Sequence, residues 1–225
     1  MLAFTRLTSV IFFVLSLSWL VCALPRPTPV MHGQKPGTAH ALSVRGHHEG
    51  AGNIKVLLGA VVDLKAKVVA RADVIKNFNS SGGFAMTGNI QIGALVQAQA
   101  EVDRLIADIE LCSSTIAELK TLNIDAQLKA SIAGHVLVII KAIIKICGSL
   151  SVKFGIQVFF EVFAKLDASL KVLLRGLDGC MDGFLVILAK LLVEADMRAL
   201  AEAKLILCHD MLVLIRAAVG IVIGA

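Results

Sequence analysis

Apolar residues recur along most of the chain at the spacing of amphipathic α-helices. The first such stretch starts at Asn53, a good N-cap residue, and predicts a helix that ends near Asn77. Its apolar stripe consists of Ile54, Leu57, Val61, Leu64, Val68, Ala72 and Ile75. Because the charged residues lie largely off this stripe, one side of the helix is predicted to face a core and the other to face water.

The stretch from Asn89 to Leu122 has the most regular pattern in the sequence. Two sets of small or apolar residues repeat every seven positions, and together they form a seam like that of a coiled coil. The two sets are Leu95, Val102, Ile109 and Ile116, and Ala98, Leu105, Cys112 and Leu119. Charges between Glu101 and Glu118 occupy the other positions, so this helix is predicted to present a wide polar face.

Two further helices, predicted over 125–150 and 152–177, are apolar around most of their circumference. A turn with two Asp-Gly pairs follows, and a last helical region extends from Gly183 to about Val222, with or without a bend. No proline occurs after Pro36, which few folds other than all-helical ones would permit. We therefore predict an all-α fold, an antiparallel bundle of about five long helices.

The N-terminal part has a different texture. Residues 1–23 combine a basic start, an apolar stretch and small residues before Leu24, the pattern of a secretory signal peptide cleaved after Ala23. Residues 24–50 hold all four prolines and show no apolar period, which predicts a disordered arm. The helical domain is then 51–225, and the protein is expected to be secreted and extracellular.

Because secreted proteins pass through an oxidising compartment, the cysteines are candidates for disulfides and one asparagine is a candidate for glycosylation. Asn79 begins the sequon Asn-Ser-Ser in a predicted Gly-rich loop, 79–88, and is predicted to be glycosylated. Four cysteines remain after removal of the leader, and helix lengths in an up-and-down bundle match their levels in only one way. This predicts disulfides between Cys112 and Cys180 and between Cys147 and Cys208; the alternative is four buried thiols.

The hydrophobicity raises the question of a membrane span. Residues 205–225 are long enough to cross a bilayer, but Asp210 and Arg216 cancel the gain from the apolar residues, since together they cost about 5 to 7 kcal/mol near its centre. Lys141 and Lys145 weaken the case for 132–150 in the same way. Burial of these helices against one another is therefore favoured over insertion.

Catalytic and metal-binding patterns are not found in the sequence, and no cofactor is expected. Cys208, His209 and Asp210 resemble a nucleophile group, but consecutive residues on a helix point about 100° apart and do not converge. His135 is predicted to be a buried or rim histidine bonded to a neighbour. A phenylalanine cluster is predicted to belong to the core, with the lining of an apolar-ligand site as the alternative. It consists of Phe154, Phe159, Phe160 and Phe163.

Charge excludes one large class of partner. The formal net charge is +5, but most of the excess lies before residue 51, and the remainder carries 18 basic against 16 acidic residues. A nearly neutral domain has no field that attracts phosphate backbones, so nucleic acid is not an expected partner.

The leader, the proline-rich arm and the proline-free hydrophobic helices together resemble the small secreted helical proteins of filamentous fungi, some of which are similar to cell-wall or hydrophobic-surface-binding proteins. The resemblance is one of layout and carries over no functional residue. It implies a non-enzymatic extracellular role, as a structural or interaction module that meets a cell wall, a host surface or lipid. The alternatives are a membrane-active protein that inserts its hydrophobic helices and a carrier of an apolar ligand.

Overall fold

The computed structural model describes the backbone of residues 46–80 and 88–221, and the side chains of residues 52–77 and 92–221. The chain divides into two units, Met1–Leu42 and Ser43–Ala225, and the described residues belong to the second. Every regular element in these residues is a helix, which confirms the all-α prediction. The helices are α2 (Gly46–Ser80), α3 (Gly88–Ala117), α4 (Ala126–Phe154), α5 (Ile156–Cys180), α6 (Phe184–Leu191), α7 (Glu194–Glu202) and α8 (Ile206–Ala218).

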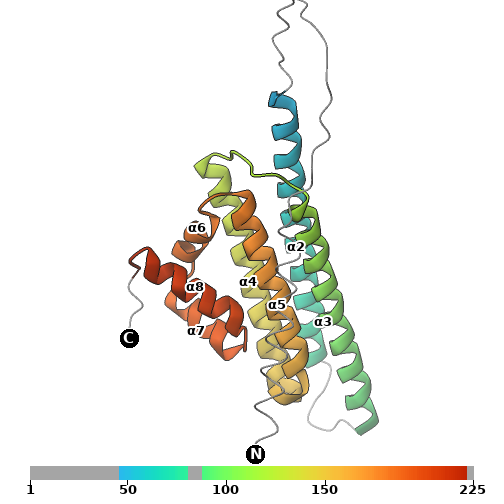
Figure 1. Ribbon diagram of the computed structural model, residues 1–225. Coiled ribbons are helices and arrows are strands. Elements are labelled where there is room, and N and C mark those ends of the chain that lie inside the picture. Colours follow the sequence, from blue (N-terminus) through green and yellow to red (C-terminus); the bar gives the residue numbers. More distant parts are fainter. Residues whose placement is uncertain (1–45, 81–87, 222–225) are drawn as a thin grey trace, which may run out of the picture. The chain divides into compact units, whose positions relative to one another are not determined.

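The four long helices pack along one another. Helix α2 contacts α3 and α4, and α5 likewise contacts α3 and α4, so each long helix has two long neighbours (Figure 1). The three short helices pack on one side of this group, with α6 against α4 and α8 against α5 and α6. Helix α7 contacts α4 and α8.

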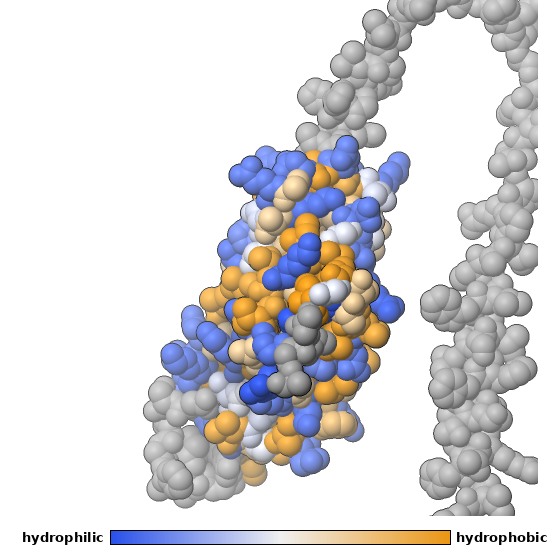
Figure 2. Space-filling model, turned by 90° about the vertical axis from the view of Figure 1, so that its left-hand side faces the viewer, coloured by the Kyte–Doolittle hydropathy of each residue, from blue (hydrophilic) through white to orange (hydrophobic). Residues whose placement is uncertain are grey.

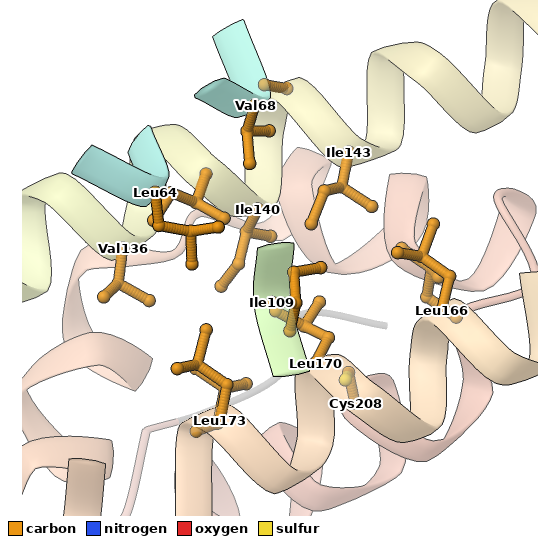
Figure 3. Close-up of a cluster of buried hydrophobic side chains, with 14 of the residues drawn as sticks. Leu64, Val68, Ile109, Val136, Ile140, Ile143, Leu166, Leu170, Leu173 and Cys208 are labelled. Carbon is orange, nitrogen blue, oxygen red and sulfur yellow. The ribbon is translucent and has the colours of Figure 1, made fainter. Parts of the chain in front are cut away.

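The predicted apolar stripes form the core. In α2, the stripe residues from Leu57 to Val68 and Ile75 are buried, while Ile54 and Ala72 pack at its edge. In α3, both seven-residue repeats are buried except for Leu95 and Leu119, which are partly buried. Figure 3 shows side chains from α2, α3, α4 and α5 pointing into one shared interior, where Cys208 of α8 joins them.

The ends of the long helices differ from the prediction. Helix α2 begins at Gly46 rather than Asn53, so the last residues assigned to the disordered arm are helical. Helix α3 ends at Ala117, because the chain beyond it turns to donate the Leu122 amide to the Cys180 carbonyl at 2.8 Å. The break between α4 and α5 falls at Gly155, whose φ of 85° is accessible to glycine at little cost.

The last region divides into three helices, so the described residues hold seven helices where about five were expected. The first break lies at Leu192 and Val193, where Asp196 accepts the Val193 amide at 3.2 Å and so caps α7. The second break lies at Lys204, the one described non-glycine residue with a positive φ, at 63°. The Leu205 amide closes this turn on the Leu200 carbonyl at 3.0 Å, the arrangement that normally selects glycine.

Helix α4 is the one described helix that is long and apolar enough to cross a membrane by length and composition. Half of its most apolar window is buried inside the protein. Lys141, which interrupts that window, forms an ion pair with Asp196 of α7 at 3.2 Å. Much of the hydrophobicity of α4 is therefore used in packing against other helices, including the short ones.

Candidate functional site

The charged face of α2 and α3 is largely neutralised within the protein. The Arg71 guanidinium donates to Asp108 at 2.6 and 3.0 Å and to Glu101 at 2.8 Å, which joins the two helices. Lys67 pairs with Asp63 at 2.8 Å and approaches Asp108 at 3.5 Å. The polar face predicted between Glu101 and Glu118 is present, and two of its carboxylates, Glu101 and Asp108, have cationic partners.

The four phenylalanines do not form one site. Phe159 and Phe163 are fully buried, with ring centroids 5.5 Å apart, as the core interpretation predicts. Phe154 contacts Phe159 from a partly buried position, whereas Phe160 is 57% exposed. Three grooves on the described part of the protein are lined by other residues: one between α2 and α3, one between α3 and α5, and one between α5 and α8.

The predicted disulfides are wrong in this structure, because all four cysteines of the folded part are free and buried. Neither the pair Cys112 and Cys180 nor the pair Cys147 and Cys208 is at bonding distance. The physical reason is that the thiols of Cys180 and Cys208 are turned toward backbone carbonyls, those of Ile116 at 3.3 Å and Asp167 at 3.5 Å. The alternative of four buried thiols is the one observed.

Burial also keeps these thiols unreactive. It raises the pKa of Cys112 to about 11, and burial together with the charge of Asp167 raises the pKa of Cys147 to about 12. Burial and the same aspartate raise the pKa of Cys208 as well. Since the thiolate is the reactive species, none of these cysteines is suited to act as a nucleophile near neutral pH.

The two histidines whose side chains the structure describes, His135 and His209, have ordinary roles. His209 and Asp210 do contact each other, with Nδ1 3.0 Å from the carboxylate, contrary to the expectation that adjacent side chains stay apart. The Cys208 thiol is buried and turned to the Asp167 carbonyl, so it does not join them. His135 is partly buried and lies with Nδ1 3.2 Å from the Lys65 ammonium. Burial and the nearby Lys65 lower the pKa of His135, so it accepts from the lysine as a neutral ring.

The glycosylation and export predictions lie largely outside the described residues. Asn79 falls in the last turn of α2, which extends to Ser80, but its side chain is not among those described. Residues 1–45, with the leader and most of the arm, are likewise outside.

Asp167 is a buried acid that the sequence pattern did not single out. It lies on α5 with 2% of its surface exposed, and its carboxylate accepts the amides of Leu207 at 2.6 Å and Cys208 at 3.0 Å. These amides belong to the first turn of α8, whose own N-cap residue, Leu205, has no side chain that can accept. Asp167 therefore caps α8 from another helix and fixes its start against α5.

Helix α8 has two faces that differ in burial. Cys208, Leu212 and Arg216 face inward and are buried, and Arg216 donates to the Leu192 carbonyl at 3.3 Å. A second apolar stripe, at spacings of four, seven and eight residues, is exposed at Leu207 and Leu214 and partly buried against the core at Met211 and Ile215. We call it the outer stripe of α8; it consists of Leu207, Met211, Leu214 and Ile215.

A groove runs beside the outer stripe, between α8 and α5. It is lined by Lys171 and Arg175 of α5 and by the outer stripe and Asp210 of α8, and has a volume of about 320 Å³. Lys171 and Arg175 follow Asp167 at intervals of one helical turn, so the residue that anchors α8 also fixes the distance from the cations to the apolar stripe.

Large apolar side chains are also exposed elsewhere in the α6 to α8 segment. Leu214 is 70% exposed, and the other exposed members in the α6 to α8 segment are Leu191, Val193, Ile206, Leu207 and Val219. Figure 2 views the protein from the side on which α6, α7 and α8 lie, and shows apolar residues gathered over the middle of that face with hydrophilic residues around them. A contiguous apolar area of this kind is typical of a contact surface.

Comparison with known proteins gives no relative: no family model and no curated protein matches the chain.

Proposed function

We propose that the chain is a secreted, non-enzymatic helical-bundle protein that acts as an interaction module and attaches to apolar surfaces through the outer stripe of α8 and its surroundings. The observation that carries the proposal is that this stripe is a second apolar face of a helix whose first apolar face is already buried. A helix in a water-soluble protein needs only one such face. The second face is therefore available for a partner.

The polar features of the remaining surface support a scaffold rather than a catalyst. Arg71 and Lys67 are held in ion pairs between α2 and α3, and the cysteines are buried and protonated. The Lys65 and His135 pair is partly buried and has no further acid or base among its described hydrogen bonds. These groups stabilise and solubilise the helices. Leu207 and Leu214 on α8 are exposed apolar residues beside a groove, which supports this side of α8 as the contact surface.

The test is adsorption of the protein to octyl-coated beads in detergent-free buffer. The variant Leu207→Glu/Leu214→Glu places two charges on the outer stripe, and its adsorption is expected to be at least about tenfold weaker, because burial of a leucine contributes about 1.5–3 kcal/mol. The matched control is Val96→Glu/Leu111→Glu on α3, where the two side chains are 59% and 60% exposed. Equal losses in the two double variants would contradict the assignment to α8.

The protein for this test comes from a secreting host, which checks the export part of the proposal. Material recovered from the medium is expected to begin at Leu24, and N-terminal sequencing shows whether it does. A chain that stays with the cell membrane would contradict secretion.

The second candidate is a membrane-active protein, and the length and apolarity of α4 favour it. The pairing of Lys141 with Asp196 opposes it, since insertion of α4 would break this ion pair and expose the core. Release of a trapped dye from liposomes by the wild-type protein, with no loss in the Leu207→Glu/Leu214→Glu variant, would favour insertion of α4 over attachment through α8.

A further inference from the structure

The groove between α5 and α8 has two chemically different walls. On α5, Lys171 and Arg175 are one turn apart, and neither forms an ion pair with any residue that the structure describes. On α8, the outer stripe supplies the side chains of Leu207, Met211, Leu214 and Ile215. The groove therefore places two cations, which no described residue pairs with, beside an apolar strip of two turns.

The remaining charged group of the groove is Asp210. Its carboxylate lies 3.0 Å from the ring of His209 on the same helix, so no lysine or arginine of the groove is neutralised by it at salt-bridge distance. The two cations and this carboxylate leave one net positive charge along the groove. A ligand head with a single negative charge matches that balance better than a neutral or multiply charged head.

The size of the groove restricts the apolar part of the ligand. Its volume of about 320 Å³ is at the lower end of the range for small-molecule sites, which is about 300 to 1,000 Å³. One alkyl chain fits beside two turns of helix, whereas the two chains of a phospholipid do not. The exposure of Leu207 and Leu214 agrees with a chain lying in an open groove.

We propose that this groove binds a single-chain anionic amphiphile, such as a fatty-acid anion. Lys171 and Arg175 bind the carboxylate, and the guanidinium of Arg175 offers paired donors for its two oxygens. The alkyl chain lies along the outer stripe of α8. The site shares Leu207 and Leu214 with the proposed surface attachment but does not depend on it, and it is separate from the phenylalanine cluster.

The test is isothermal titration calorimetry of the full chain with decanoate below its micelle concentration. We expect saturable binding of one decanoate per chain, and at least tenfold weaker binding of decanol and of decylammonium at the same concentrations. Equal affinity for decanoate and decanol would overturn the assignment of the head to Lys171 and Arg175.

Two variants with the same change in charge locate the site. Lys171→Glu/Arg175→Glu is expected to weaken decanoate binding at least tenfold. Lys145→Glu/Arg198→Glu, which alters exposed residues of α4 and α7 outside the groove, is expected to leave it within twofold. If both variants lose binding equally, net charge rather than the groove is responsible and the proposal is wrong. Circular dichroism and thermal unfolding verify that each variant is folded.

A separate experiment distinguishes binding to a lipid bilayer from binding to the free amphiphile. Vesicles of phosphatidylcholine with phosphatidylglycerol are offered with and without decanoate. Binding to these vesicles that depends on Lys171 and Arg175 and is not reduced by decanoate would assign the cations to a membrane surface and overturn the proposal. If the wild-type protein binds decanoate but does not adsorb to octyl beads, only the proposed function is contradicted. If it adsorbs to octyl beads but does not bind decanoate, only this site is contradicted.

Discussion

The α2–α3 pair and the α6–α8 segment differ in how they bury apolar residues and pair their charges. Helices α2 and α3 have 35 and 30 residues, each with one apolar stripe, and their charges pair across the interface. Helices α6, α7 and α8 have 8, 9 and 13 residues and are turned by breaks at Val193 and Lys204. Both regions expose some large apolar side chains, such as Val96 on α3 and Leu214 on α8, but only the long helices also join their charged residues across the interface in a cluster of ion pairs centred on Arg71.

The difference in length also affects how each region is held. Seam residues such as Leu105 and Ile109 repeat over several turns of α3, so the α2–α3 contact is distributed. Helix α8 has a much shorter apolar contact, with Cys208 and Leu212 buried, and polar contacts at its two ends, from Asp167 at its first turn and from Arg216 at its last. We expect loss of one contact to spread through the whole protein in the first region and to stay local in the second.

The largest expected effect is in the α3 seam. Leu105 is fully buried, so Leu105→Ala removes apolar contacts and leaves a cavity, and is expected to lower the free energy of unfolding by about 3 kcal/mol. Urea denaturation followed by circular dichroism measures it. The control is Leu111→Ala on the same helix, which is 60% exposed and is expected to change stability by less than about 0.5 kcal/mol. Similar losses in the two variants would show that the seam does not carry the stability of α2 and α3.

The seam could be predicted from the sequence because periodicity is local information. The residues of α2 and α3 that recur every three or four positions are the ones found buried, and Asp125 caps α4 by accepting the Leu128 amide at 2.8 Å, at the predicted start of that helix. In these elements the pattern of side chains and the packing agree, so the apolar stripe is enough to identify the core face.

The helix ends depend on contacts between distant residues. Gly176 and Gly179 predict a turn, yet α5 continues through both to Cys180, where packing outweighs the cost of about 1 kcal/mol for each glycine. Conversely, Lys204 ends α7 without a glycine or proline, because Leu205 is buried after it and the backbone must turn. Neither the continuation of α5 nor the end of α7 is indicated by the residues nearby in the sequence.

The candidate site was missed for the same reason. Asp167, Lys171 and Arg175 look like ordinary members of a charged ridge on α5, and nothing nearby in sequence indicates that α8 starts against them. The cysteines were misassigned because matching levels along helices fixes height only. It does not fix the direction of a thiol, and those of Cys180 and Cys208 point to carbonyls.

The second prediction concerns the anchor of α8. Asp167→Ala leaves the amides of Leu207 and Cys208 without their acceptor and is expected to lower the free energy of unfolding by about 2 kcal/mol. The matched control is Asp125→Ala, which removes an exposed N-cap that accepts one amide, with an expected loss of about 1 kcal/mol.

Thiol labelling measures whether the loss of Asp167 opens α8 alone or the whole protein. Native-state labelling with a thiol reagent, read by peptide mass spectrometry, is expected to become faster at Cys208 in Asp167→Ala and to stay unchanged at Cys112 of α3. Equal acceleration at both cysteines would mean that α8 does not open independently of α2 and α3.

The smallest expected effect separates paired from unpaired cations. Arg71 is 21% exposed and bonded to two carboxylates, so Arg71→Gln is expected to cost about 1 kcal/mol, a loss that shrinks as salt rises. Lys171→Gln removes the same charge from the α5–α8 groove, where no described residue pairs with it, and is expected to change stability by less than about 0.5 kcal/mol. Urea denaturation at low and high salt measures both. A cost for Lys171→Gln as large as that for Arg71→Gln would show that the groove lysine has a structural role, and the cation would then no longer be free for a ligand.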